Sequence, residues 1–129
     1  MSITVIPVAA AVVRRGDRIL LAQRMPGKQY AGQWEFPGGK LEEGESIGQA
    51  LVRELREELG VEARTGKVLN VCLERNYMVI FMEAELLDDE LHFVEVQDAR
   101  FVTVAEARSM DMTPQDRKAM EEMLSIGRL

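Results

Sequence analysis

Three glutamates on one predicted helix are the residues in this chain best suited to chemistry. Glu54, Glu57 and Glu58 occupy relative positions i, i+3 and i+4, which on an α-helix share one face within roughly 100° of arc. Like charges at this spacing repel each other, whereas carboxylate oxygens are suitable ligands for hard divalent cations. The spacing therefore indicates a metal site. The alternative is a solvated acidic face with an ordinary Arg53–Glu57 ion pair.

The helix that carries these acids has recognisable ends. Leucines recur every four residues from Leu51 to Leu59 and form the apolar stripe of an amphipathic helix. Ser46 and Gln49 make a Ser-x-x-Gln capping box at the start, and a glycine follows the last leucine, where a left-handed residue commonly ends a helix. These signals predict a helix over residues 47–59, with the glutamates flanking its buried stripe.

The rest of the chain predicts strands mixed with few helices. Two strands over residues 3–13 and 18–23 are joined by a tight turn. Residues 25–33 form a loop with proline and glycine, and loops beside a rigid sheet often border binding sites. The later elements are expected to be strands over 61–73, 77–86 and 100–104, a short helix from Thr103 to about Met110, and a final helix opened by Thr113, Pro114 and Asp116. The predicted fold class is α+β.

Composition limits both the class of protein and its partners. The 129 residues, of which 47% are apolar and 29% charged, predict one globular domain over residues 1–129. The net charge of −6 disfavours nucleic acid polymers as partners, so the expected partner is a small molecule. If that molecule is a polyphosphate, divalent cations must mediate between two negative bodies.

Neither a membrane span nor a secretory signal is expected. The longest apolar stretch, residues 3–13, is about half a membrane span long and contains Pro7, and arginines follow it rather than precede it. The lone Cys72 permits no internal disulfide and is expected to pack as a small hydrophobe. A cytoplasmic location is the default expectation.

The segment around the acidic helix resembles a known family signature, the Nudix box. No defined position departs from the family's pattern, which here reads Gly39-x5-Glu45-x7-Arg53-Glu54-Leu55-x-Glu57-Glu58-x-Gly60-Val61. Residues 20–24 and 34–40 are also similar to the MutT-like branch, which cleans nucleoside triphosphate pools. The resemblance implies the Nudix fold, a mixed β-sheet sandwiched between α-helices.

The resemblance also implies roles for the residues of the box. The metal ligands would be Glu54, Glu57, Glu58 and the carbonyl group of Gly38. Arg53 would orient the carboxylates by hydrogen bonding, and Glu45 would support the loop rather than bind metal directly. The expected ion is Mg²⁺, with Mn²⁺ as the alternative, and it would neutralise phosphate charge and lower the pKa of a bound water.

A fourth acid is expected in the loop before the strand at residues 100–104. Glu95 lies six residues before the aromatic residue that begins this strand, the spacing at which the MutT-like branch places a metal ligand and candidate general base. Glu90 and Asp98 are rivals in the same loop. His92 is the only histidine and suits acid–base work, although a lone loop histidine is more often incidental.

A second group of residues resembles the family's substrate-binding positions. Arg24 and Glu35 would border the nucleotide pocket, and Lys40 would contact phosphate oxygens, although surface arginines and lysines are often only solvated. Phe36 could stack on a base or belong to the core. Asp116 falls where relatives read the base with an Asn or Asp, but it also fits the third position of a Thr113 capping box.

The resemblance implies hydrolysis of a nucleoside triphosphate to the monophosphate and pyrophosphate. The first expectation for the substrate is 8-oxo-dGTP, whose removal avoids mutation and supports DNA repair. CTP or a modified pyrimidine triphosphate is the alternative that Asp116 suggests, because a carboxylate accepts hydrogen bonds from amino groups. A nucleotide-sensing module without catalysis is the rival from another class. A monomer and a homodimer are both compatible with the sequence.

Overall fold

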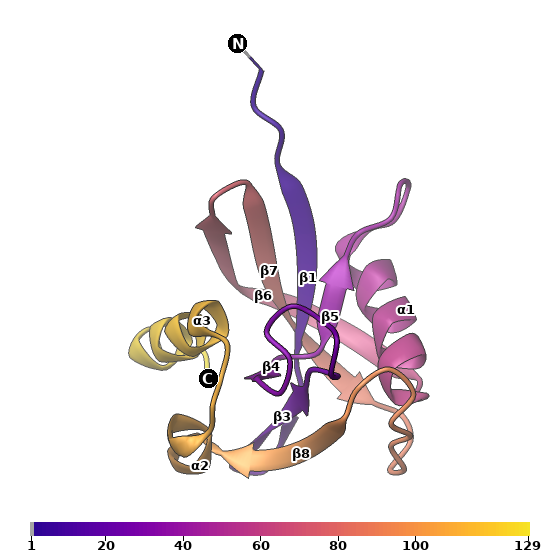
Figure 1. The fold of residues 1–129 in the computed structure, drawn as a ribbon, viewed down its shortest axis with the longest axis vertical. Helices are drawn as coiled ribbons and strands as arrows, with labels where there is room; N and C mark the ends of the chain where they lie inside the picture. Colours follow the sequence, from indigo (N-terminus) through magenta and orange to yellow (C-terminus); the bar gives the residue numbers. More distant parts are fainter. Residues whose placement is uncertain (1) are drawn as a thin grey trace.

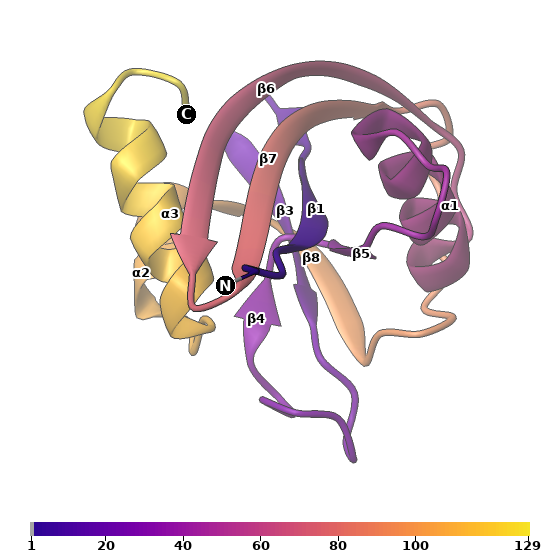
Figure 2. The same cartoon turned by 90° about the horizontal axis from the view of Figure 1, so that it is seen from above.

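Two β-sheets lie between helices α1 and α3 in the computed structural model, which describes residues 2–129 (Figure 1). Helix α1 spans Ile47–Leu59 and α3 spans Pro114–Ser125. The two helices lie on opposite sides of the sheets in both views (Figures 1 and 2), and the short helix α2, Val104–Ser109, lies on the α3 side. The α+β class is confirmed, with two sheets rather than one between the helices.

The first sheet is mixed and has the strand order β5-β1-β7-β6. Strand β1 runs parallel to β7 and antiparallel to β5, while β6 and β7 form an antiparallel hairpin. The bounds are Ile6–Val12 for β1, Gly38–Lys40 for β5, Ala63–Glu74 for β6 and Tyr77–Leu86 for β7. The two strands predicted over residues 61–73 and 77–86 are therefore confirmed.

The second sheet is antiparallel and is centred on β3. Strand β3 pairs with β2, β4 and β8. The bounds are Arg14–Arg15 for β2, Arg18–Gln23 for β3, Trp34–Glu35 for β4 and Asp98–Thr103 for β8. The two strands predicted over residues 3–13 and 18–23 and the tight turn between them are present, but β1 itself does not pair with β3, because β5 and β7 already occupy both of its edges. The hairpin with β3 is formed by β2, and the Leu20 N–H also donates to the Val13 carbonyl oxygen at 3.0 Å.

The central strands are buried on both faces, which explains their continuous apolar sequence. In β1, Ala9 and Ala11 pack in the cluster that includes the buried side of α1. Ala10 and Val12 belong to the cluster that contains Ala107 of α2 and three residues of α3. The molecule thus has a core on each side of its sheets. The core that contains Ala9 and Ala11 positions α1.

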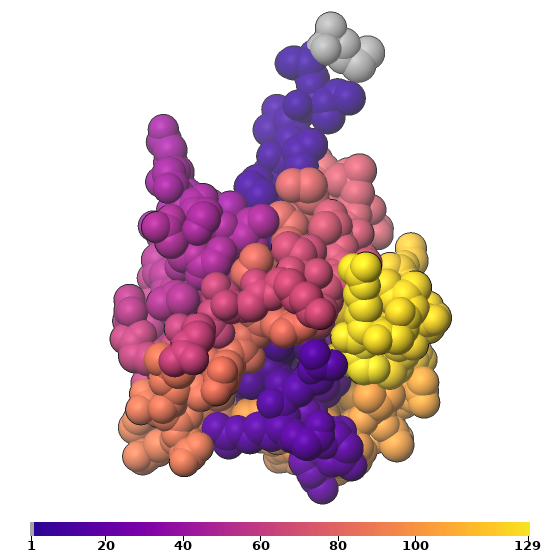
Figure 3. All heavy atoms as spheres, turned by 180° about the vertical axis from the view of Figure 1, so that it is seen from behind, coloured from indigo at the N-terminus to yellow at the C-terminus, as the bar shows by residue number. Residues whose placement is uncertain are grey.

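One end of the molecule carries two projecting segments (Figure 3). Residues 2–5, before β1, and the loop between β5 and α1 both extend beyond the body of the protein there. The loop contains the exposed acids Glu42 and Glu43. The loop leads directly into the start of α1, so it lies next to the predicted site.

Candidate active site

Helix α1 has the predicted bounds and holds its acids at the margin of the core. The Ser46 hydroxyl accepts a hydrogen bond from the Gln49 backbone N–H, and the Gln49 side chain accepts one from the Ser46 N–H, so the capping box is present. Gly60 ends the helix with a left-handed φ of 59°. Glu54 and Glu58 are half-buried beside the apolar stripe of Ala50, Leu51, Leu55 and Leu59.

Arg53 links the carboxylates of the site through its guanidinium group. Its Nε and Nη2 donate to the two carboxylate oxygens of Glu45 at 2.7 and 2.9 Å, and these hydrogen bonds lower the pKa of Glu45 to about 2. Its Nη1 donates to Glu54 Oε1 at 2.9 Å and to Glu57 Oε2 at 3.2 Å. Its Nη2 also donates to the Lys40 carbonyl oxygen at 3.0 Å. The predicted hydrogen bonds of Arg53 are present, and its role in catalysis stays a prediction.

Two consecutive glycines let strand β5 pass between β1 and α1. A Cβ on Gly38 would lie 2.0 Å from the Ala9 carbonyl oxygen, and one on Gly39 would lie 2.4 Å from Glu54 Oε1. The backbone of Gly38 also acts on the Glu58 carboxylate and opposes the rise in its pKa. The sequence predicted only the Gly38 carbonyl as a site group. Gly39 was missed as a contact of Glu54, although the doubled glycine after Pro37 was its signal.

Glu54 and Glu58 form a close pair of acids at this edge. Their carboxyl groups hydrogen-bond to each other. Burial, and then the neighbouring charges of Glu54 and Glu35, raise the pKa of Glu58 well above its ordinary value. Burial likewise raises the pKa of Glu54, while Arg53 opposes that rise. Two acids in such contact are stable with a shared proton or with a bound cation between them.

A second polar cluster lies next to this pair. Arg24 Nη1 donates to both carboxylate oxygens of Glu35, at 2.9 and 2.6 Å. Burial raises the pKa of Glu35 despite this ion pair. Burial and the charge of Glu35 raise the pKa of Asp116 to about 7. Because the charge of Glu35 acts on Glu58 as well as on Asp116, Glu35 lies near both the acids of α1 and the start of α3.

Two predictions for this cluster need correction. Phe36 is only 2% exposed and packs edge-on against Phe81, with ring centroids 5.6 Å apart, so its ring belongs to the core and cannot stack on a base. Asp116 does not cap its own helix from Thr113, which forms no side-chain cap hydrogen bond. Instead, Asp116 Oδ2 accepts a hydrogen bond from the Phe36 N–H at 2.9 Å, and this buried contact joins α3 to the residue that follows β4.

The loop that contains Glu95 covers the end of α1. The backbone N–H groups of Val94 and Glu95 both donate to the carbonyl oxygen of Glu58, at 3.0 and 3.2 Å. The Glu95 side chain is exposed, so its backbone lies at the site while its carboxylate faces solvent. Its rival Asp98 is engaged locally, since it accepts from the Ala99 N–H and from Arg100 Nε. Geometry therefore favours Glu95 over Asp98.

Three other residues considered from the sequence have simpler surroundings. The Lys40 ammonium lies 5.7 Å from the ring centroid of Tyr77, and its side chain is exposed. Cys72 is partly buried against the core, and burial followed by the nearby Glu122 raises its pKa to about 11. A thiol with so high a pKa is a poor nucleophile at neutral pH. His92 packs beside Gly60 at the end of α1.

Comparison with known proteins decides the family. The family model described as NUDIX domain matches residues 5–123. The chain belongs to the Nudix family. A CTP pyrophosphohydrolase of Escherichia coli K12 is 40% identical over 125 residues, covering 94% of this chain and 93% of that protein. A Mycobacterium tuberculosis H37Rv protein, provisionally named 8-oxo-dGTP diphosphatase 2, is 38% identical and covers 87% and 82%.

Solved structures agree with this assignment. The solution structure of the Escherichia coli ORF135 protein superimposes with a TM-score of 0.77 at 36% identity, covering 96% of this chain and 91% of that one. The Nudix fold and the similarity to the MutT-like branch are thus confirmed. This Nudix protein is an enzyme that acts on phosphoric anhydrides. Within residues 2–129, no helix is both long enough and apolar enough to cross a bilayer.

Nudix hydrolases generally use divalent metal ions, and the donors here fit such an ion in part. Glu54 and Glu58 offer carboxylate oxygens at one point, which is the chemistry that hard cations require. Across the described chain, however, no three Asp, Glu, His or Cys side chains converge closely enough to hold a metal. Glu57 is exposed and bonded to Arg53, and Glu95 is exposed. The expected three-carboxylate cluster is therefore not assembled, and Glu57 and Glu95 would have to turn inward.

Proposed function

We propose that this Nudix enzyme hydrolyses a nucleoside triphosphate to the monophosphate and pyrophosphate. The observation that carries the proposal is the contact between the Glu54 and Glu58 carboxyl groups at the edge of the core. Such a pair is held together best by a divalent cation, for which we propose Mg²⁺, with Mn²⁺ as a substitute. The proposed ligands are Glu54, Glu57, Glu58, the Gly38 carbonyl and Glu95.

The chain's own residues would position the reactants. Arg53 would hold Glu54 for the ion by its hydrogen bond, while Glu45 keeps the guanidinium in place. Glu95 lies at the end of α1, where a side-chain rotation would let it take a proton from the attacking water. The ion, when bound, would supply a water of lowered pKa and neutralise phosphate charge. These roles stay predictions.

The cluster next to the acids supports a nucleotide as the substrate. In this cluster Arg24 supplies a positive charge and Asp116 supplies a buried carboxyl group. Glu35 lies near both Asp116 and Glu58. We propose that Arg24 approaches phosphate or base, that Lys40 contacts phosphate oxygens, and that Asp116 reads the base edge. A carboxyl group with a pKa near 7 accepts a hydrogen bond when ionised and donates one when protonated.

Among the candidate substrates we place the cytosine nucleotide CTP first. The similar CTP pyrophosphohydrolase covers almost the whole chain, and an ionised Asp116 suits the amino group of cytosine, which only donates. The second candidate is 8-oxo-dGTP, the first expectation from the sequence, and the Mycobacterium tuberculosis relative supports it. A role in nucleotide-pool cleaning and a cytoplasmic location would accompany either substrate.

A substrate panel tests the proposal. Purified protein with Mg²⁺ would be assayed on CTP, dCTP, 8-oxo-dGTP, dGTP and ADP-ribose, with the products identified. We expect pyrophosphate and monophosphate, with kcat/KM for CTP at least about tenfold above that for dGTP, since one good base contact is worth about 1–3 kcal/mol. Glu58→Gln should lower kcat by about 10²-fold or more. Binding of all five compounds without turnover would indicate a sensing module instead.

A further inference from the structure

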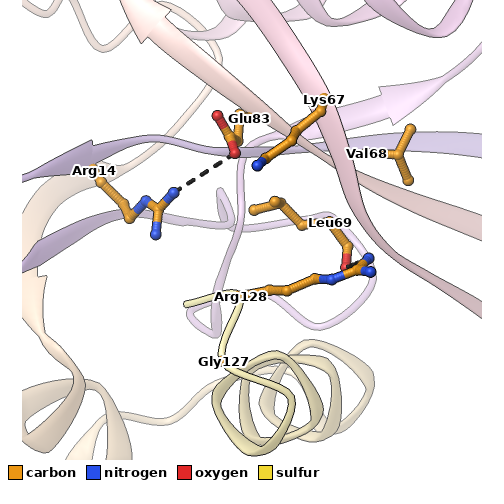
Figure 4. Close-up of a pocket in the computed structure, with 7 residues that line it drawn as sticks. All are labelled: Arg14, Lys67, Val68, Leu69, Glu83, Gly127 and Arg128. Atoms are coloured by element: carbon orange, nitrogen blue, oxygen red, sulfur yellow. Dashed lines mark hydrogen bonds and ion pairs between the residues drawn. The ribbon is translucent and has the colours of Figure 1, made fainter.

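An open cavity lies away from the proposed active site, where β6 and β7 meet the start of β2 and the chain after α3 (Figure 4). Its volume is about 260 Å³. Its walls include three basic side chains, Arg14, Lys67 and Arg128, and one acid, Glu83. No residue proposed for catalysis or substrate binding lines it, so any ligand here would occupy a separate site.

Positive charge predominates in this cavity. Arg14 Nη2 lies 3.7 Å from Glu83 Oε1, which is a long and half-exposed ion pair. Arg128 is held by a hydrogen bond from Nη1 to the Leu69 carbonyl oxygen at 3.1 Å. In the part of the chain that the structure describes, no carboxylate lies within ion-pair distance of the Lys67 ammonium. Three cations against one acid give a local positive charge in a protein whose net charge is −6.

An irregularity in β6 builds the wall that carries Lys67. The register of β6 against β7 shifts twice between Thr65 and Asn70, and such bulges bend a strand and redirect its side chains. At Gly66 an added Cβ would lie 3.2 Å from the Glu83 side chain, so the strand crosses closely over this acid. The Lys67 side chain is exposed, and its ammonium end points toward the Glu83 side of the cavity (Figure 4).

We propose that this cavity binds a small anion of the pyrophosphate class. Guanidinium forks and ammonium groups together suit phosphate oxygens, because the first bind two oxygens at once and the second acts as a mobile point charge. The volume is below that of pockets for drug-sized ligands, which favours a phosphate group without a nucleoside. Arg14 and Lys67 would hold the anion, while Arg128 stays fixed at the rim by its bond to the backbone.

Calorimetric titration of the full chain with inorganic pyrophosphate in excess EDTA tests this site. Without divalent ions the acids of α1 repel anions, so binding under these conditions reports the basic cavity. Lys67→Gln should raise Kd about tenfold, the loss expected for one charge-assisted contact, whereas Glu83→Gln should lower it. The matched control is Arg64→Gln, which removes the same charge from an exposed position on β6 outside the cavity. It should change Kd by less than about twofold.

Three outcomes would overturn the proposal. The first is no binding by the wild-type protein at millimolar pyrophosphate. The second is equal weakening by Lys67→Gln and Arg64→Gln, which would indicate diffuse charge attraction. The third concerns amide chemical shifts, which pyrophosphate should change at residues 66–69 and 127–128. If the changes were confined to residues 38–58, the anion would be bound at α1 and not in the cavity. None of these results depends on turnover, so they are distinguishable from failure of the proposed function.

Discussion

Arg53 has more partners than any other side chain of the site, and its geometry predicts a large effect of a conservative change. Lysine keeps the charge of Arg53 but cannot form the bidentate pair with Glu45 while also bonding Glu54. We expect Arg53→Lys to lower kcat by about 10–100-fold, the usual effect of losing a residue that orients metal ligands. The matched control is Arg56→Lys on the same helix, since Arg56 pairs with Glu62 on the exposed side. Equal losses in both variants would contradict the orienting role.

The buried carboxyl group of Asp116 predicts a specific pH dependence of stability. Burial, and then the charge of Glu35, raise its pKa to about 7 from an ordinary 3.8. Between these values the folded protein keeps a proton that the unfolded chain has released, so stability falls as pH rises through the window. Asp116→Asn keeps an acceptor for the Phe36 N–H but does not titrate.

The comparison of these two proteins by urea unfolding isolates that effect. From pH 5 to pH 8, the wild-type free energy of unfolding should fall by about 2–3 kcal/mol relative to Asp116→Asn, as a shift of about three pKa units requires. Other carboxyl groups are present in both proteins, so most of their contribution cancels. Parallel stability curves would show that Asp116 titrates near its ordinary value.

At the scale of elements, strand β5 depends on two glycines for different reasons. An added Cβ at position 38 meets the backbone of β1, which cannot move without breaking the sheet, whereas at position 39 it meets the Glu54 side chain, which can rotate. Gly38→Ala should therefore destabilise the fold by about 3 kcal/mol or more. Gly39→Ala should stay folded but lose about tenfold or more in kcat, because Glu54 is displaced. Thermal unfolding and kcat measured on both variants check this, and equal losses of stability would contradict it.

Local signals predicted the elements well, and distant contacts account for the errors. The capping box, the leucine repeat and the glycine that bound α1 all lie within or next to the helix, and its observed bounds match. The parallel pairing of β1 was not predicted, because its partner begins at Tyr77 and nothing in residues 3–23 signals that strand. For Asp116, a helix cap was the alternative to base reading, and its observed partner could not be foreseen because the Phe36 N–H is 80 residues away in the sequence.

The candidate site shows the same division between local and distant information. The positions of the acids on α1 follow from helical spacing, and so does the i,i+4 contact of Arg53 with Glu57. The side-chain directions of Glu57 and Glu95 do not follow from spacing. The direction of the Glu57 side chain depends on its hydrogen bond with Arg53. The direction of the Glu95 side chain depends on the path of the loop that covers the end of α1. Sequence therefore predicts which elements meet at the site, while the structure decides which carboxylates already face each other.

At the scale of the whole molecule, the fold stores electrostatic repulsion that a cation should relieve. The protein has a net charge of −6, and Glu54 and Glu58 share the edge of the core in direct contact. A divalent ion that binds only the folded state stabilises it by RT ln(1 + [M]/Kd), about 2.7 kcal/mol at a concentration of 100 Kd. Thermal unfolding in EDTA should therefore show a Tm that rises when Mg²⁺ is added.

Glu58→Gln separates specific binding from general ionic screening. In EDTA at pH 8 the variant should be as stable as the wild type or more so, because it removes a buried acid whose pKa is raised by burial. On addition of Mg²⁺ its Tm should rise much less than that of the wild type, because one ligand is gone. KCl at matched ionic strength gives the screening contribution for both proteins. If Mg²⁺ raised both Tm values equally, or no more than KCl does, the ion would not be bound at the Glu54–Glu58 pair.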